Sequence, residues 1–423
     1  MPSPEPNPFP RARPPASPLT LADLTADLVW PALCRAGHIA LRPSRIGMAL
    51  VFVVGLMLLL GLSDRLDSDP DGNALETVAT VLRLDGAAAA ISPGEPGERI
   101  GRQLFNSLVA EPGVFLQKNP WAALIAFPLI VLWTALAGGA ICRSAACDVG
   151  QSVGIDWPAA VGFALSRWRS LLLALIGPLL MVWAITLAMA IAGWALFSLP
   201  VLNLIGGFAW PLFLFGGGVC AIVMLAFVVG WPLLIPSVAC EGTDAVDALQ
   251  HAYSFVFARP LRLAVYLAIL LAQFVLLGGV VLLICWLSVH IARTCALQWS
   301  GVRGVEVLGS LPRHGGIPTP NDIAGTARGA HWLASLWTLL PAVGLPLAFI
   351  VSYIWSGSTV LYLAMRRIVD GQDMHEIWMP GMVEGTQAQA GAPTSSPGPS
   401  PIAGAPASPK PEAVSDNGPA DET

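Results

Sequence analysis

The chain has 423 residues, of which 55% are hydrophobic and 12% are charged, and its formal net charge at pH 7 is −5. Soluble globular proteins contain about 25% charged residues, so this composition excludes an ordinary soluble domain, and nothing in the charge balance points to a nucleic-acid partner. A mean hydropathy of +0.67 is typical of a protein embedded in a lipid bilayer.

Five long apolar runs contain none of the 22 basic and 27 acidic side chains. A membrane-spanning helix needs roughly 20 apolar residues, so the uncharged run over residues 170–240 is expected to hold two helices, with a break between Ser198 and Asn203. The pattern predicts an all-α, polytopic membrane helical bundle of six transmembrane helices within residues 46–380. We place the spans at residues 46–62, 121–141, 171–197, 208–237, 263–291 and 335–365.

The chain before the first span falls into two parts. Residues 1–18 are rich in proline and small side chains, so we expect a disordered leader. Residues 19–45 predict an amphipathic segment at the membrane interface, which ends in Arg42 and Arg45. Because basic residues concentrate on the cytoplasmic side of a membrane, the amino terminus is expected in the cytoplasm, with the first span as an uncleaved anchor.

The loop over residues 63–118 is acidic, which fits the outer side of the membrane, and residues 72–112 predict a small helical cap. Its stretch Asp67-Ser-Asp69-Pro-Asp71-Gly72 matches the first half of a calcium-binding EF-hand loop. The second half does not match, because Val78 stands where the bidentate glutamate is needed. The stretch therefore predicts either an acidic turn that caps a helix or a weak calcium site, and no other metal or cofactor is expected.

The last elements are expected to return the chain to the cytoplasm. Arg366 and Arg367 follow the sixth span, and residues 381–423 are rich in Ala, Gly, Pro and Ser, which predicts a disordered tail. Six spans put both termini in the cytoplasm, and we expect the protein in the cytoplasmic (inner) membrane of a bacterium. The loop after the fifth span has a basic bias that does not fit the outer side, so seven spans are the alternative. Its arginines are Arg293, Arg303, Arg313 and Arg328.

A pattern that recurs three times favours six spans over seven. An amphipathic stretch is followed by two closely spaced arginines and then by an odd-numbered span, while a related acidic motif follows each even-numbered span. The chain is therefore predicted to contain three related two-span units. The arginine pairs are Arg42 and Arg45, Arg167 and Arg169, and Arg259 and Arg262.

The acidic motifs have a local physical interpretation. In Asp244-Ala-Val-Asp247 and in Asp373-Met-His-Glu376, the first acid can cap a helix and the second lies in the first turn, where the helix dipole favours negative charge. We expect three amphipathic helices to form a collar at the headgroup level on the cytoplasmic side. Two interpretations of the six paired arginines stay open: they contact lipid phosphates or a protein partner, or they only fix the orientation of the spans.

Four stretches carry a resemblance to known proteins: Cys240 to Leu249, Tyr253 to Val256, Arg259-Pro260, and Arg366 to Gly371. They resemble uncharacterised six-span integral membrane proteins of planctomycete-type bacteria. The layout over residues 25–378 is also similar to the membrane domain fused to some glycerophosphodiester phosphodiesterases. The phosphodiesterase half has no counterpart in this sequence, so the resemblance implies a polytopic protein of the cytoplasmic membrane and does not imply that activity.

Polar residues in and beside the spans give two further hypotheses. Hydrogen-bonding side chains within a bundle either join helices or line a path for a solute. Ser288 near the outer end of the fifth span, together with His331 at the start of the sixth, is compatible with a hydrolase at the membrane interface, although no G-x-S-x-G turn accompanies them. The candidate path residues are Gln273, Ser352, Ser356, Thr359 and Tyr362.

These observations favour a non-enzymatic membrane scaffold or a lipid-associated accessory protein, with membrane lipids and other membrane proteins as partners. The motifs of common soluble enzymes are absent from the sequence, and the spans hold no charged side chain that could relay protons or bind ions. A carrier or channel for a neutral or apolar solute is the alternative function, and a membrane-interface hydrolase is a further one. Nothing in the sequence specifies a ligand or an oligomeric state.

Overall fold

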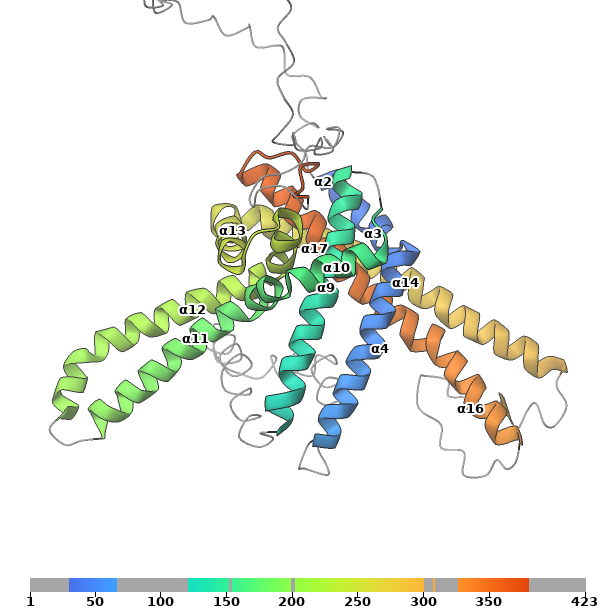
Figure 1. Cartoon of the computed structure of the whole chain (residues 1–423), viewed down its shortest axis with the longest axis horizontal. Helices are drawn as coiled ribbons and strands as arrows, with labels where there is room; N and C mark the ends of the chain where they lie inside the picture. Colours follow the sequence, from blue (N-terminus) through green and yellow to red (C-terminus); the bar gives the residue numbers. More distant parts are fainter. Residues whose placement is uncertain are drawn as a thin grey trace, which may run out of the picture. The chain divides into compact units, whose positions relative to one another are not determined.

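The computed structural model describes residues 30–66, 121–151, 154–198, 202–299, 307–308 and 326–379. Within these ranges the secondary structure is helical, without β-strands, and six helices are long and apolar enough to cross a membrane (Figure 1). The predicted all-α polytopic fold is confirmed. The predicted leader, helical cap and tail, and the acidic stretch with Asp67, Asp69 and Asp71, lie outside the described residues.

The six spans follow the predicted order along the chain. The first pair is α4 (Pro43–Leu66) and α9 (Phe127–Gln151), with the π-helix η2 (Ala122–Ala126) in front of α9. The second pair is α11 (Trp168–Phe197) and α12 (Leu202–Glu241), which are separated where the sequence predicts the break.

The third pair contains a composite helix. Its first member is α14 (Pro260–Trp299), and its second runs through α16 (Thr326–Leu339), the π-helix η3 (Leu340–Gly344) and α17 (Leu345–Val369). Pro341 lies in η3. Because proline has no backbone N–H, it removes one bond of the regular helix, and the π-helical turn carries the chain past it.

Two spans are much longer than predicted. The helices α12 and α14 have 40 residues each, which corresponds to about 60 Å at 1.5 Å per residue, roughly twice the 30 Å thickness of the hydrocarbon core. The sequence prediction placed these spans at residues 208–237 and 263–291. In the structure α12 instead continues into protein packing, because residues 232–241 are all buried.

A short helix stands in front of each odd-numbered span. The helices α2 (Trp30–Leu33) and α3 (Arg35–Ala40) precede α4, α10 (Trp157–Ser166) precedes α11, and α13 (Ala245–Ala258) precedes α14. The three units therefore share one order of elements. Asp244 caps α13 as expected, since its Oδ1 accepts hydrogen bonds from the backbone N–H groups of Val246 and Asp247, both at 3.0 Å.

The third acidic motif does not start a helix, so this part of the prediction is wrong. After α17, residues 370–379 form an irregular exit segment with a turn at residues 374–375. The backbone carbonyls of Asp373 and Glu376 accept hydrogen bonds from Arg366. The carbonyl of Asp373 also accepts a bond of 3.2 Å from the backbone N–H of Glu376, which closes the turn.

Buried residues gather at one end of the spans, which we call the hub. It consists of residues 138–150 of α9, 232–241 of α12 and 355–366 of α17, all of them buried, with α3, α10 and α13 packed around these three segments. The beginning of α4 joins it through the buried side chain of Arg45. The first span therefore starts, and the last one ends, in the same packed region, as an even number of spans requires.

Away from the hub the spans are open. Leu204 and Phe208, near the start of α12, are 82% and 90% exposed, although α11 and α12 lie side by side along their length (Figure 1). In α14 only 6% of the residues in its most apolar stretch are buried. Protein packing thus holds the spans at one end, and most of their apolar length is left for lipid.

We predict that the hub tolerates no added volume at Gly139 of α9. A Cβ atom at this position would lie 2.4 Å from Cδ1 of Leu171 in α11, which is fully buried. Replacement of Gly139 by valine should lower the free energy of unfolding by about 1–3 kcal/mol through overpacking, measured by thermal unfolding in detergent. The matched control is Gly279→Val in α14, where a Cβ atom meets nothing within 4 Å. Equal midpoints for the two variants would contradict the prediction.

Candidate functional site

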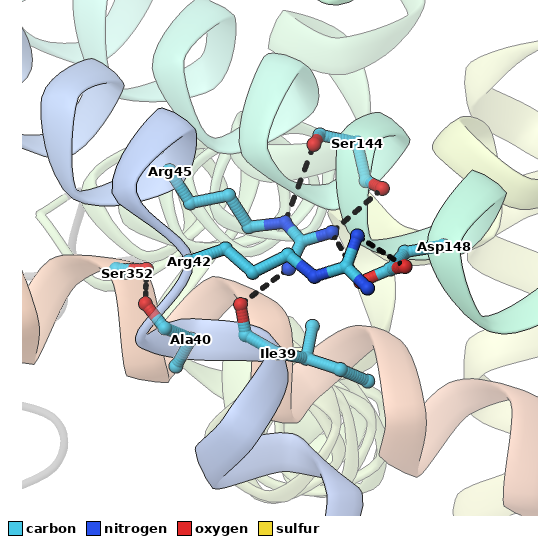
Figure 2. A network of polar contacts seen from close by, with 7 residues as sticks. All are labelled: Ile39, Ala40, Arg42, Arg45, Ser144, Asp148 and Ser352. Carbon is cyan, nitrogen blue, oxygen red and sulfur yellow. Dashed lines mark hydrogen bonds and ion pairs between the residues drawn. The ribbon is translucent and has the colours of Figure 1, made fainter. Parts of the chain in front are cut away.

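A buried cluster of charges joins the first two spans at the hub. Arg45 of α4 is 1% exposed, and its Nη2 lies 2.8 Å from Oδ2 of Asp148 in α9. Nη1 of Arg42 lies 2.6 Å from the other carboxylate oxygen. Figure 2 shows the two guanidinium groups meeting the same carboxylate, one at each oxygen. One acid on α9 thereby balances one of the two positive charges of the first arginine pair.

The remaining donors of Arg45 are also occupied. Its Nε donates to the hydroxyl of Ser144 at 3.2 Å, Nη2 donates to the Ser144 carbonyl at 3.0 Å, and Nη1 donates to the carbonyl of Ile39 in α3 (Figure 2). The expectation that Arg45 contacts lipid is therefore corrected, because its guanidinium lies in the protein interior. Arg42 is 37% exposed at its side chain, but it serves the same ion pair.

Two further arginines are buried in the hub, and sequence reasoning gave neither a role in packing. Arg143 of α9 donates from Nη1 to the carbonyl of Ala239 in α12 at 3.0 Å, and its guanidinium lies 4.7 Å from the ring centre of Phe163 in α10. Trp378 of the exit segment covers it at 5.9 Å. The side chain thus links α9, α10, α12 and the exit segment through a hydrogen bond and cation–π contacts.

Arg366 at the end of α17 fixes the exit segment. It is fully buried, and its Nη2 donates to the carbonyls of Asp373 and Glu376. Its Nε and Nη1 have no hydrogen-bond partner within the described ranges. The backbone N–H of Trp378 adds a bond of 2.8 Å to the carbonyl of Cys240, so the segment is held against the ends of both α12 and α17.

Tyr362, a candidate solute-path residue, also forms part of this packing. Its hydroxyl donates to Oε1 of Glu241 at the end of α12, and both side chains are buried. His251 of α13 lies 3.6 Å from the other carboxylate oxygen. Tyr362 therefore joins α17 to α12 and α13, and it borders neither of the two cavities described below.

The other candidate path residues make similar bonds between helices. Gln273 of α14 donates from Nε2 to the carbonyl of Cys34 at 2.7 Å and accepts a bond of 3.0 Å from the hydroxyl of Tyr353. Ser352 donates to the carbonyl of Ala40 at 2.7 Å.

Thr359 bonds within its own helix, and the buried hydroxyl of Ser356 has no partner among the described residues. None of the path candidates, Gln273, Ser352, Ser356, Thr359 and Tyr362, borders the two cavities.

The second and third arginine pairs lie nearer the surface. Arg167 is half-buried, with its guanidinium 5.3 Å from the ring centre of Trp378. Arg169, Arg259 and Arg262 are exposed, and Arg169 lies 5.6 Å from the ring centre of its neighbour Trp168. Exposed arginines beside exposed aromatic side chains are typical of the zone between hydrocarbon and water. These three arginines are therefore the members of the predicted set that are free to reach lipid.

The two residues of the hydrolase hypothesis are not brought together by a hydrogen bond within the described ranges. Ser288 is exposed on α14, whereas His331 of α16 is 1% exposed. Nδ1 of the histidine lies 2.9 Å from the carbonyl oxygen of Val307, and Nε2 lies 3.5 Å from the hydroxyl of Ser335. The ring is therefore occupied by neighbours other than Ser288.

Two cavities lie beside the hub. The first, which we call the hub pocket, has a volume of about 470 Å³ and lies between α2, α3, α9, α17 and the exit segment. The second has a volume of about 520 Å³ and is an apolar groove between α4, α9 and α10 that includes Phe52, Trp133 and Trp157. No group of three or more His, Cys, Asp or Glu side chains that could hold a metal ion occurs in the described part of the chain.

Comparison of the chain with protein-family models, curated proteins and solved structures gives no match. The resemblance to six-span membrane proteins of planctomycete-type bacteria therefore stays a prediction.

We predict that Asp148→Asn destabilises the protein strongly. The change leaves the buried Arg45 guanidinium without an opposite charge, and breaking a buried ion pair costs about 3–5 kcal/mol. Chemical unfolding in detergent measures the loss. The exposed Asp247 of α13 provides the control, since Asp247→Asn should change stability by less than about 1 kcal/mol.

A double-mutant cycle separates this pair from general damage to the hub. With Arg45→Gln and Asp148→Asn combined, the loss should be clearly smaller than the sum of the two single losses. Additive losses would show that the two side chains do not stabilise each other.

Proposed function

We propose that the chain is a non-enzymatic membrane scaffold and lipid-associated accessory protein. The observation that carries this proposal is the distribution of burial. The three span pairs pack together at the hub, whereas large apolar side chains along the rest of the spans are exposed, as in α14 and the first half of α12. Such exposed apolar surface at membrane depth is available to lipid and to the spans of other membrane proteins.

The polar side chains support this function over transport. Gln273, Ser352 and Tyr362 each form a hydrogen bond to another helix. A side chain that binds a passing solute needs free hydrogen-bond donors or acceptors in an open path. The donors of these three side chains are instead used in bonds that join the helices of the hub.

The proposed function includes an orientation. Exposed Arg169, Arg259 and Arg262 all belong to the hub end of the odd-numbered spans. Because arginine is enriched on the cytoplasmic side, we propose that the hub faces the cytoplasm and that both termini are cytoplasmic, in the inner membrane of a bacterium. The three exposed arginines then face the leaflet that carries anionic lipid headgroups.

We predict that Arg169, Arg259 and Arg262 hold anionic lipid. Replacing all three by glutamine should reduce the phosphatidylglycerol that co-purifies with the protein by at least about tenfold, because each basic residue near an anionic surface contributes about 1 kcal/mol. Mass spectrometry of the extracted lipids measures the change, and a pull-down from native membranes reports on protein partners.

The triple lysine variant is the matched control. It keeps the positive charges, so it should retain most of the lipid. If the glutamine variant kept both its lipid and its protein partners, the proposed function would lose its support.

We predict that the two exposed cysteines lie on opposite sides of the membrane. Cys34 stands at the hub, and Cys295 lies near the far end of α14. In cells whose outer membrane has been permeabilised, a membrane-impermeant maleimide should label a variant that keeps only Cys295. A variant that keeps only Cys34 should be labelled after the inner membrane is disrupted. Labelling of Cys34 before disruption would reverse the proposed orientation.

A further inference from the structure

The hub pocket combines basic and apolar walls. Arg35 of α3, Arg367 of α17 and His375 of the exit segment border it on the basic side, and Val149, Val360 and Met374 contribute to the apolar side. Among the described residues that line it there is no acid. A cavity of about 470 Å³ lies within the range of small-ligand sites in proteins.

The two arginines are available for a ligand. Both are exposed, and neither forms an ion pair within the described ranges. The nearest acid along α9 is Asp148, and both of its oxygens are engaged by Arg42 and Arg45. The hub pocket therefore presents two guanidinium groups that form no ion pair in the described part of the chain, although Asp370, Asp373 and Glu376 lie close to it in sequence.

His375 is held in the wall of the hub pocket by two backbone carbonyls. Its Nδ1 lies 3.1 Å from the carbonyl oxygen of Val149 and 3.3 Å from that of Gly150. Because carbonyl oxygens only accept, Nδ1 carries the hydrogen and donates it. The hydrogen bonds fix the orientation of the ring at the pocket wall.

The exit segment holds this side of the pocket in place. Arg366 bonds to the carbonyls that flank Met374 and His375, and the N–H of Trp378 bonds to Cys240. Gly150 provides the close approach, because a Cβ atom there would lie 3.1 Å from the carbonyl oxygen of His375. The pocket is thus built from fixed backbone on one side and from helix ends on the other, so little ordering is needed when a ligand binds.

We propose that the hub pocket binds a phosphate-bearing anion. A guanidinium group offers two parallel N–H donors that match the oxygens of a phosphate, and Arg35 and Arg367 approach from two different helices. The apolar side accommodates a non-polar group attached to the phosphate. The anion belongs either to a lipid headgroup or to a soluble phosphate compound, and the first source deepens the proposed lipid-associated function and rests on it.

The experiment compares the full-length wild type with the double variant Arg35→Gln/Arg367→Gln. Inorganic phosphate is titrated into each detergent-purified protein in a calorimeter. Phosphatidylglycerol and phosphatidylcholine are titrated separately at limiting concentration and counted as bound lipids by native mass spectrometry. Both replaced side chains are exposed, so the thermal midpoint should stay unchanged. The control Arg169→Gln/Arg262→Gln removes two charges outside the pocket.

The proposal predicts that the pocket variant loses at least about tenfold in affinity for one phosphate source, since two charge-assisted contacts are removed. Weaker binding of inorganic phosphate identifies a soluble ligand. Weaker binding of phosphatidylglycerol, with phosphatidylcholine and inorganic phosphate bound poorly by all forms, identifies a lipid.

Wild-type affinity in the pocket variant, or no binding of any probe to the wild type, overturns the proposal. Loss of lipid in the control pair but not in the pocket variant overturns the pocket alone and leaves the proposed function standing.

Discussion

The packing of the hub depends on charges that have been removed from water and must find partners inside the protein. Arg45 is almost completely buried, and an uncompensated guanidinium in the interior costs several kcal/mol. Asp148 supplies the opposite charge from α9, Ser144 supplies a hydroxyl and a carbonyl, and α3 supplies the carbonyl of Ile39. This one side chain thus ties the helices α3, α4 and α9 together.

The other buried arginines meet the same requirement differently. Arg143 uses a carbonyl near the end of α12 and the faces of two aromatic rings, and Arg366 uses two carbonyls of the exit segment. Carbonyls at a helix end carry partial negative charge and suit a cation. All these charges lie at the hub end of the spans, where they act between protein elements rather than in lipid. Outside the hub, the bond of 3.0 Å from Nε1 of Trp133 in α9 to the carbonyl of Phe52 in α4 joins two spans without any charge.

Much of the architecture can be predicted from the sequence pattern, whereas the tertiary contacts cannot. Runs without charge set the number of spans and the break between α11 and α12, because burial of apolar residues in lipid is a local property. The cap at Asp244 is also local, because its carboxylate bonds to N–H groups two and three residues further along the chain. The bond from Tyr362 to Glu241 joins residues more than a hundred positions apart, and the length of α12 depends on packing against other helices. The turn after Asp373 depends on Arg366, which bonds to carbonyls of that segment. No periodicity in the sequence encodes these contacts. The basic hub pocket was also missed, since Arg35, Arg367 and His375 come from three separate segments.

The length of α12 has a consequence for the bilayer itself. Residues 202–231, ahead of its buried end, carry no charge and correspond to about 45 Å at 1.5 Å per residue. This apolar length exceeds a hydrocarbon layer roughly 30 Å thick. A helix with such an excess of apolar length tilts, kinks or thickens the bilayer around it. Each of these responses links the free energy of α12 to the local thickness of the bilayer, so membranes of different thickness are expected to hold the protein to different extents.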